Sequence, residues 1–148
     1  MAGYSNQKVF ILYEDEHLLV VKKPFGMESQ RGKSFAMDQE SLLRGYLSSK
    51  TKTDNPYLAV VHRLDRPVAG VMVYAKTKKA AADLSAQLQT ENFSKKYEAV
   101  VSGIVPACEG RLEDYLTADK RTGTTSVSSK ADPLAKKAVL TWKEIARE

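Results

Sequence analysis

Two short apolar runs on either side of a charged turn place the strongest constraint on how this chain can fold. The runs are residues 58–61 (LAVV) and 71–75 (VMVYA), and the turn between them begins with the segment HRLDR, residues 62–66. Short runs rich in β-branched and aromatic side chains are typical of strands. We therefore expect strands over residues 58–63 and 71–76, joined by a charged turn.

Asp65 is the only carboxylate in this turn, and Arg63 and Arg66 lie on either side of it. Adjacent cations favour the ionised form of a carboxylate. An ionised carboxylate at the end of a strand is suited to attack on a sugar carbon, or to binding a cation. An ion pair that closes a corner between two strands explains the same residues. In either case we expect Asp65 at the mouth of a cleft, within salt-bridge range of Arg63 or Arg66.

The rest of the chain predicts more strands than helices. Asp38 is expected to cap a helix that runs to about residue 49, and Thr77 a helix over residues 78–90 with Ala81, Leu84 and Leu88 as its buried stripe. Residues 26–34 are expected to form a loop. Because the elements follow in irregular order, the fold class is α+β. Further strands are expected over residues 9–13, 18–22, 97–102, 111–116, 126–129 and 137–145.

Composition favours one globular domain. The 148 residues are 43% hydrophobic and 28% charged, which is ordinary for a folded domain and argues against disorder. No apolar run approaches the ~18 residues that a membrane span needs. The single cysteine, Cys108, excludes an internal disulfide and favours a reducing, cytoplasmic location. Because His17 and His62 are far apart in the sequence, no zinc-type cluster is expected.

The chain carries a net charge of +5, which is modestly basic. Basic surface attracts polyanions, and contacts with phosphate supply much of the affinity for nucleic acid. A solvated surface would explain a charge of this size equally well. The position of the charges favours a phosphate-binding rim, since many basic residues lie near Asp65 in the sequence: Arg63, Arg66, Lys76, Lys78, Lys79, Lys95 and Lys96.

Four segments of the chain, in the same order, resemble the RluA-type pseudouridine synthases. They are residues 13–27 (YEDEHLLVVKKPFGM), 62–70 (HRLDRPVAG), 96–103 (KYEAVVSG) and 135–142 (AKKAVLTW). The resemblance implies a mixed, mainly antiparallel sheet with flanking helices. It also implies an RNA-modifying isomerase that uses no metal or other cofactor.

Two departures from the family pattern bear on activity. Pro67-Val68-Ala69 stands where the family commonly has Asp or Glu followed by Thr and Ser, so two hydroxyls are absent near the turn. Family members also continue with a strand that carries further basic residues, whereas this sequence ends at Glu148. Residues 1–148 are therefore expected to be the N-terminal and central part of one catalytic domain, without a separate N-terminal RNA-binding domain. Alone, they are expected to bind RNA weakly and to show little or no isomerisation.

The resemblance also implies roles for individual residues. Asp65 would be the nucleophile, and Tyr97 would stack on the uracil ring in the same cleft. Arg63 would contact the RNA backbone or fill the space that a flipped nucleotide leaves. From their positions in the sequence near Asp65, Arg66, Lys76 and Lys96 are expected to contribute to RNA binding; an ordinary place on the solvated surface explains the lysines equally well. A non-catalytic RNA-binding protein with the same fold is the alternative, and a glycoside hydrolase is more distant because no motif places a second carboxylate beside Asp65. Ribosomal and transfer RNA both remain open as substrates, and a monomer is favoured.

Overall fold

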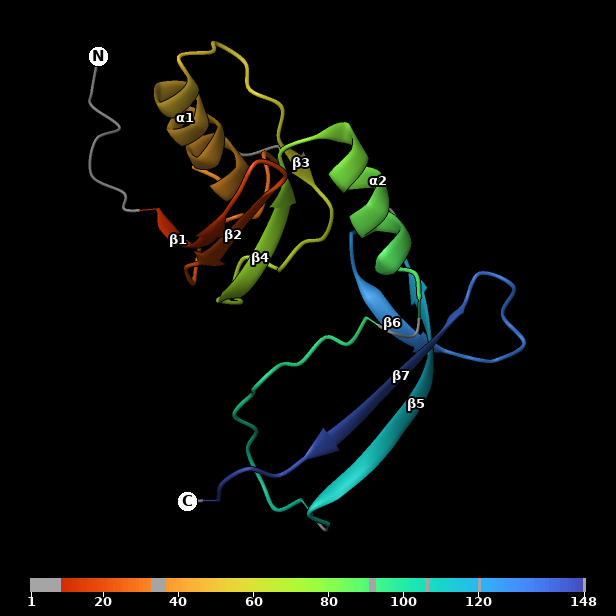
Figure 1. Ribbon diagram of the computed structural model, residues 1–148. Helices are drawn as coiled ribbons and strands as arrows, with labels where there is room; N and C mark the ends of the chain where they lie inside the picture. The colour runs from red at the N-terminus through yellow and green to blue at the C-terminus, as the bar shows by residue number, and fades with distance from the viewer. Residues whose placement is uncertain (1–8, 33–36, 91–92, 106, 120, 148) are drawn as a thin grey trace. The chain divides into compact units, whose positions relative to one another are not determined.

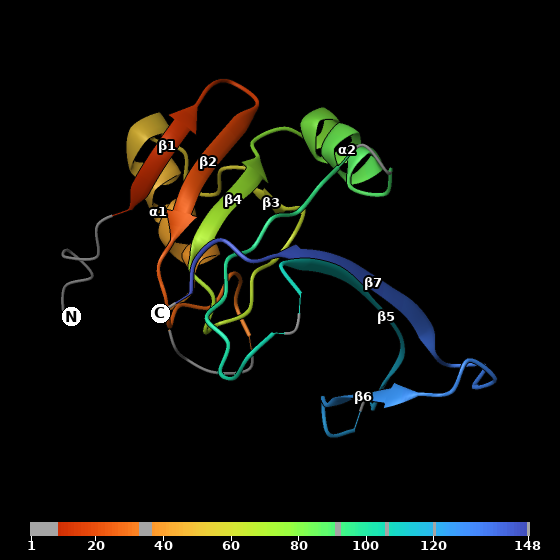
Figure 2. The same ribbon diagram turned by 90° about the horizontal axis from the view of Figure 1, so that it is seen from below.

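The computed structural model describes residues 9–32, 37–90, 93–105, 107–119 and 121–147. The chain divides into two compact units, Met1–Lys96 and Tyr97–Glu148. Each unit has its own sheet (Figures 1 and 2), and each is described by itself below.

The first unit is built on a four-stranded antiparallel sheet. Its strands are β1 (Phe10–Glu14), β2 (Leu18–Lys23), β3 (Ala59–Val60) and β4 (Gly70–Ala75), in the order β1-β2-β4-β3 (Figure 2). In the central β2–β4 pair, Lys23 lies opposite Gly70 at one end and Leu18 lies opposite Ala75 at the other. The charged turn before Gly70 and the segment after Lys23 therefore leave the sheet at the same end.

One helix covers this sheet and completes the core. Helix α1 (Gln39–Thr51) begins at Asp38, whose carboxylate accepts a hydrogen bond from the Ser41 amide at 2.9 Å, as an N-cap residue does. The helix packs against one face of the sheet (Figure 1), because alternate residues of β2 and β4 point to that face. The fully or almost fully buried residues of this core are Leu19, Val21, Leu43, Leu47, Leu58, Met72 and Tyr74.

Helix α2 (Lys78–Gln87) lies beside β3 and β4. Thr77 caps its first turn as expected, accepting a hydrogen bond from the Ala80 amide at 3.2 Å. The expected stripe of Ala81, Leu84 and Leu88 is only half-buried, so this part of the prediction is wrong. The first unit has no second sheet or helix layer among its described residues to enclose that side of α2.

The second unit contains a three-stranded antiparallel sheet. Its strands are β5 (Glu109–Ala118), β6 (Thr125–Ser128) and β7 (Lys136–Lys143), in the order β6-β5-β7. Leu112 of β5 lies opposite Leu140 of β7, and both side chains point to the same face of the sheet. The other face carries charged groups. There the Glu113 carboxylate forms ion pairs with Arg111 at 3.0 Å and with Lys137 at 2.7 Å.

The α+β class with mainly antiparallel sheets is confirmed, and two strand predictions need correction. Residues 97–102 form no strand, because they have no ladder partner among the described residues. The strand expected over residues 58–63 is limited to Ala59–Val60. Beyond Val60 the amide of Val73 on β4 donates instead to the ring Nε2 of His62, at 3.1 Å, so a side chain replaces the ladder. No helix in the described ranges is long and apolar enough to cross a membrane.

Candidate functional site

The charged turn is fixed to the segment that follows β2. The amide of Gly26 donates to the carbonyl of Arg66 at 2.9 Å, and the Arg66 Nε donates back to the carbonyl of Gly26 at 3.0 Å. Gly26 has φ +79°, a left-handed conformation that side chains with a Cβ seldom adopt. These reciprocal bonds hold two loops together that are 40 residues apart in the sequence.

Lys23, at the end of β2, lies beneath both loops. Its side chain is fully buried, and its ammonium donates to the carbonyls of Met27 at 2.7 Å, Pro24 at 3.2 Å and Arg66 at 3.4 Å. Burial lowers the pKa of Lys23, and the negative charge of Asp65 opposes this by raising it. Lys23 therefore has a structural role, and its ammonium supplies positive charge below the turn.

Ser29 makes a second connection between the two loops. Its hydroxyl donates to the carbonyl of Leu64 and accepts from the amide of Leu64 at 3.0 Å, although the two residues are 35 positions apart. The carbonyl of Ser29 itself accepts a hydrogen bond from the hydroxyl of the buried Tyr74 at 3.3 Å. Ser29 thus links the core to the residue directly before Asp65.

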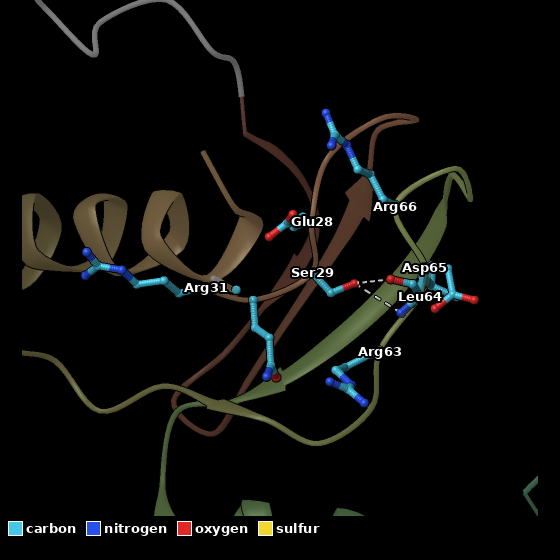
Figure 3. Close-up of a pocket in the computed structure, with 9 residues that line it drawn as sticks. Glu28, Ser29, Arg31, Arg63, Leu64, Asp65 and Arg66 are labelled. Atoms are coloured by element: carbon cyan, nitrogen blue, oxygen red, sulfur yellow. Dashed lines mark hydrogen bonds between the residues drawn. The ribbon is translucent and has the colours of Figure 1, made fainter. Parts of the chain in front are cut away.

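These contacts shape a shallow pocket of about 270 Å³ (Figure 3). One wall comes from the loop after β2 and the other from the charged turn. Asp65, Arg63 and Arg66 are all exposed at it, and Arg31 also belongs to the lining, with its guanidinium directed away from Asp65 (Figure 3). The lining residues are Glu28, Ser29, Gln30, Arg31, Gly32, Arg63, Leu64, Asp65 and Arg66.

The expected position of Asp65 in a cleft is confirmed, but the expected ion pair is wrong. Among the described residues no arginine lies within 4.0 Å of its carboxylate. Figure 3 shows the guanidinium groups of Arg63 and Arg66 turned away from Asp65. An ion pair between exposed groups gains little free energy in water, so nothing forces these side chains together. The Asp65 carboxylate is consequently accessible to a ligand.

His62, at the start of the turn, is half-buried and acts as a hydrogen-bond acceptor. Burial lowers the pKa of its imidazole, and the positive charge of Lys95 lowers it further. Both effects favour the neutral ring, which is the form that can accept from the Val73 amide through Nε2. His62 therefore packs and forms its hydrogen bond within the scaffold.

The predicted RNA-binding lysines lie in different surroundings. Lys76 follows the far end of β4, roughly 20 Å from the turn at the strand rise of about 3.3 Å per residue. Its ammonium binds the Glu14 carboxylate at 2.8 Å and the Asp15 carbonyl. The structure thus gives Lys76 a place in the scaffold away from Asp65, and contact between Lys76 and RNA stays a prediction. Lys96 is exposed at the end of the first unit.

Tyr97 is the first residue of the second unit, and 62% of its surface is exposed. Asp65 belongs to the first unit. The predicted meeting of Tyr97 and Asp65 in one cleft therefore stays a prediction.

Sequence reasoning missed the contribution of the loop after β2. The sequence predicts only a loop over residues 26–34, yet Glu28 to Gly32 line the pocket; residues 33 and 34 lie outside the described residues. The position of this loop after a Lys-Pro-x-Gly motif was the available signal. Nothing in the local sequence pairs Ser29 with a residue 35 positions away.

The arrangement suits one kind of chemistry. An accessible carboxylate in a pocket that three arginines line can attack or stabilise an electron-poor sugar carbon, and exposed guanidinium groups can bind phosphate. Glu28 adds a second carboxylate to the pocket lining, which the sequence did not predict. Within the described ranges no three His, Cys, Asp or Glu side chains come together in a way that could hold a metal ion.

Comparison with known proteins gives one consistent result. A family model described as RNA pseudouridylate synthase matches residues 17–148. The chain is 41% identical over 96 residues to ribosomal large subunit pseudouridine synthase D of Pseudomonas aeruginosa, covering 64% of this chain and 29% of that protein. It is 38% identical over 109 residues to the dual-specificity RNA pseudouridine synthase RluA of Vibrio vulnificus, covering 74% of this chain and 41% of that protein.

A third relative extends the match along the chain. An uncharacterized RNA pseudouridine synthase of Mycoplasma genitalium is 33% identical over 134 residues, which is 88% of this chain and 41% of that protein. The chain therefore spans well under half the length of these three relatives. The solved structure of human RNA pseudouridylate synthase domain containing 4 has a similar fold, with a TM-score of 0.66 at 24% identity, over 88% of this chain and 51% of that one.

Proposed function

The chain belongs to the RNA pseudouridylate synthase family, and on this premise we propose that the protein containing it isomerises uridine to pseudouridine in structured RNA. The observation that carries the proposal is the exposed Asp65 carboxylate in a pocket with three arginines, within the segment HRLDR. Ribosomal or transfer RNA is the proposed substrate; the name of one relative specifies the large ribosomal subunit, which supports the ribosomal choice. A cytoplasmic location belongs to the same proposal.

In the proposed reaction Asp65 acts on the target nucleotide as nucleophile. Its carboxylate bonds to C1′ of the sugar as the bond between C1′ and the base nitrogen breaks. The uracil then turns, and its C5 forms the new bond to C1′ as the carboxylate leaves. The proton on C5 leaves for a base and a proton returns to the freed nitrogen, so the product is an isomer of the substrate. Tyr97 is proposed to stack on the uracil and to accept the C5 proton.

The arginines are proposed to bind the RNA around this base. To reach C1′, the nucleotide must leave its stack, which costs a few kcal/mol in a duplex and less in a loop. A planar guanidinium can bind phosphate with two hydrogen bonds, or stack where the base was. Arg63 and Arg66 are exposed at the pocket and can serve in both ways. The exposed Lys96 is proposed as a further contact with RNA.

Two other functions have specific support. The absence of the usual hydroxyls at Pro67-Val68-Ala69 favours a non-catalytic RNA-binding protein that retains the fold. The presence of Glu28 in the pocket lining favours a glycoside hydrolase, which uses two carboxylates. The family match favours the isomerase over both.

The direct test uses the protein that contains this chain, purified at full length. It is incubated with total ribosomal and transfer RNA from cells that lack its gene, and pseudouridine is detected by carbodiimide labelling and mass spectrometry. We expect new label at a defined uridine, without added metal or nucleotide. No label in any RNA, combined with retained RNA binding, would favour the non-catalytic alternative, whereas release of free base would favour hydrolysis.

A further inference from the structure

Ser29 is a buried polar residue that the proposed reaction does not use directly. Only 5% of its surface is exposed, and its hydroxyl makes two hydrogen bonds to one residue, Leu64. It donates to the Leu64 carbonyl and accepts from the Leu64 amide, at 3.0 Å in the second case. One side chain thus satisfies both backbone groups of the residue before Asp65.

The two hydrogen bonds from Ser29 to Leu64 lie where the chain has no sheet partner. The β3 ladder ends at Val60, so the backbone that carries Asp65 has left the sheet. A neighbouring strand would normally satisfy the amide and carbonyl of Leu64, and here the Ser29 hydroxyl does so. The Leu64 side chain meanwhile packs against the core, while Asp65 faces solvent.

Ser29 is itself held in place. Its carbonyl accepts from the hydroxyl of Tyr74, which is fully buried on β4. The hydroxyl that holds Leu64 therefore belongs to a residue anchored in the core of the first unit. A continuous set of hydrogen bonds runs from Tyr74 through Ser29 to the backbone next to the proposed nucleophile.

We infer that Ser29 is a positioning residue that holds the Asp65 carboxylate in its reactive orientation through both backbone groups of Leu64. The inference rests on the proposed function for its kinetic part alone. Removal of the hydroxyl leaves the Leu64 amide and carbonyl without their partner, and the turn relaxes. A displacement of about 1 Å in a reacting group can cost roughly 100-fold in rate. RNA affinity depends on the arginines and changes little.

The test compares Ser29→Ala with Ser29→Thr, which keeps the hydroxyl, in the full-length protein. Ser49→Ala is the matched control, because the exposed Ser49 hydroxyl bonds only within α1, to the Tyr46 carbonyl at 2.8 Å. For Ser29→Ala we expect kcat to fall at least about 10-fold with KM for RNA within about 2-fold of wild type. Ser29→Thr should recover most of the rate, and Ser49→Ala should match wild type.

Amide hydrogen exchange at residues 63–66 provides a second readout that needs no substrate. We expect faster exchange there in Ser29→Ala, and wild-type exchange there in Ser49→Ala. If Ser29→Ala does not fold, Ser29→Cys decides, since the thiol keeps the size but bonds weakly. An unchanged kcat in an active enzyme, or unchanged exchange at residues 63–66, would overturn the inference. A wild-type protein that converts no uridine would instead refute the proposed function, and exchange would still decide whether Ser29 holds the turn.

Discussion

His62 shows how one side chain can end a strand and begin the charged turn. Its Nε2 accepts a hydrogen bond from the Val73 amide, and a longer β3 would have accepted that bond through its backbone instead. This bond requires a neutral ring, and burial together with Lys95 lowers the pKa of His62. Protonation therefore competes with the contact that fixes the start of the turn.

At the residue scale, we predict that the free energy of unfolding depends on the charge of His62. Because its folded-state pKa lies below the ordinary 6.5, the stabilisation is complete above that value and is lost as the pH falls through the lowered pKa. Urea unfolding at several pH values between about 7.5 and 5 should show a decline in stability on acidification that His62→Gln reduces. His17→Gln, at an exposed histidine, is the control and should retain the wild-type decline. Equal pH dependence in His62→Gln and wild type would refute the prediction.

At the element scale, Glu14 joins β1 to two other elements. Its half-buried carboxylate accepts from Lys50 and Tyr46 of α1 and from Lys76 after β4. Burial alone raises the pKa of Glu14, but hydrogen bonds from Lys50, Lys76 and Tyr46 outweigh it and lower the pKa to about 2. The carboxylate therefore stays ionised at every pH where the protein is expected to work.

We predict that Glu14→Gln destabilises the first unit by roughly 2 kcal/mol at pH 7, since it leaves the partly buried Lys76 ammonium without its ion pair. The Glu14 contribution is fully present above the ordinary pKa of 4.5 and is lost as the pH falls towards about 2, so the difference should shrink in acid. Circular dichroism during urea unfolding measures it. Glu16→Gln, at an exposed carboxylate, serves as the control, and equal loss in both variants would contradict the ion-pair network.

Two glycines in different elements provide an opposed pair of predictions. A Cβ on Gly110 of β5 would lie 2.8–2.9 Å from the Trp142 ring on β7, whereas a Cβ on Gly45 of α1 meets nothing within 4 Å. Gly110→Ala should therefore cost about 1–3 kcal/mol through overpacking. Gly45→Ala should add about 0.5–1 kcal/mol through helix propensity.

Trp142 is the only tryptophan in the chain, so its fluorescence follows the second unit in urea unfolding. Gly110→Ala should move that transition to lower urea concentration. Gly45→Ala should move the unfolding transition that is followed by helical circular dichroism to higher urea concentration. A Gly110→Ala protein as stable as wild type would show that the close approach of Trp142 does not limit this position.

At the scale of the whole molecule, the sequence predicted the helix caps and strands that depend on residues close together in the sequence. The caps at Asp38 and Thr77 follow from local hydrogen bonding, and the strands around the charged turn follow from their composition. Prediction from local sequence was wrong where residues far apart in the sequence determine whether a strand forms or where it ends. Residues 97–102 have strand composition without a described ladder partner, and β3 ends where His62 takes its place.

The site was predictable to the same extent. The segment HRLDR identified Asp65 and its arginines, and the pocket is where these residues predicted it. The connections from Ser29 to Leu64 and from Gly26 to Arg66 span 35 and 40 residues, and no period or motif encodes such distances. The ion pair was wrong because adjacency in sequence does not make exposed side chains meet.

The central claim is that Asp65 is the nucleophile of an RNA-modifying isomerase, and substitution of this carboxylate in the full-length protein tests it most directly. Asp65→Asn keeps the size of the side chain and removes its charge, while Asp54→Asn changes another exposed carboxylate, which lies outside the pocket. Pseudouridine formation and RNA affinity are measured for both variants and for wild type.

We predict that Asp65→Asn lowers conversion by at least about 10³-fold, as expected for loss of a nucleophile, while RNA affinity is retained or slightly increased. Asp54→Asn should convert RNA at the wild-type rate. Unchanged turnover by Asp65→Asn would contradict the account.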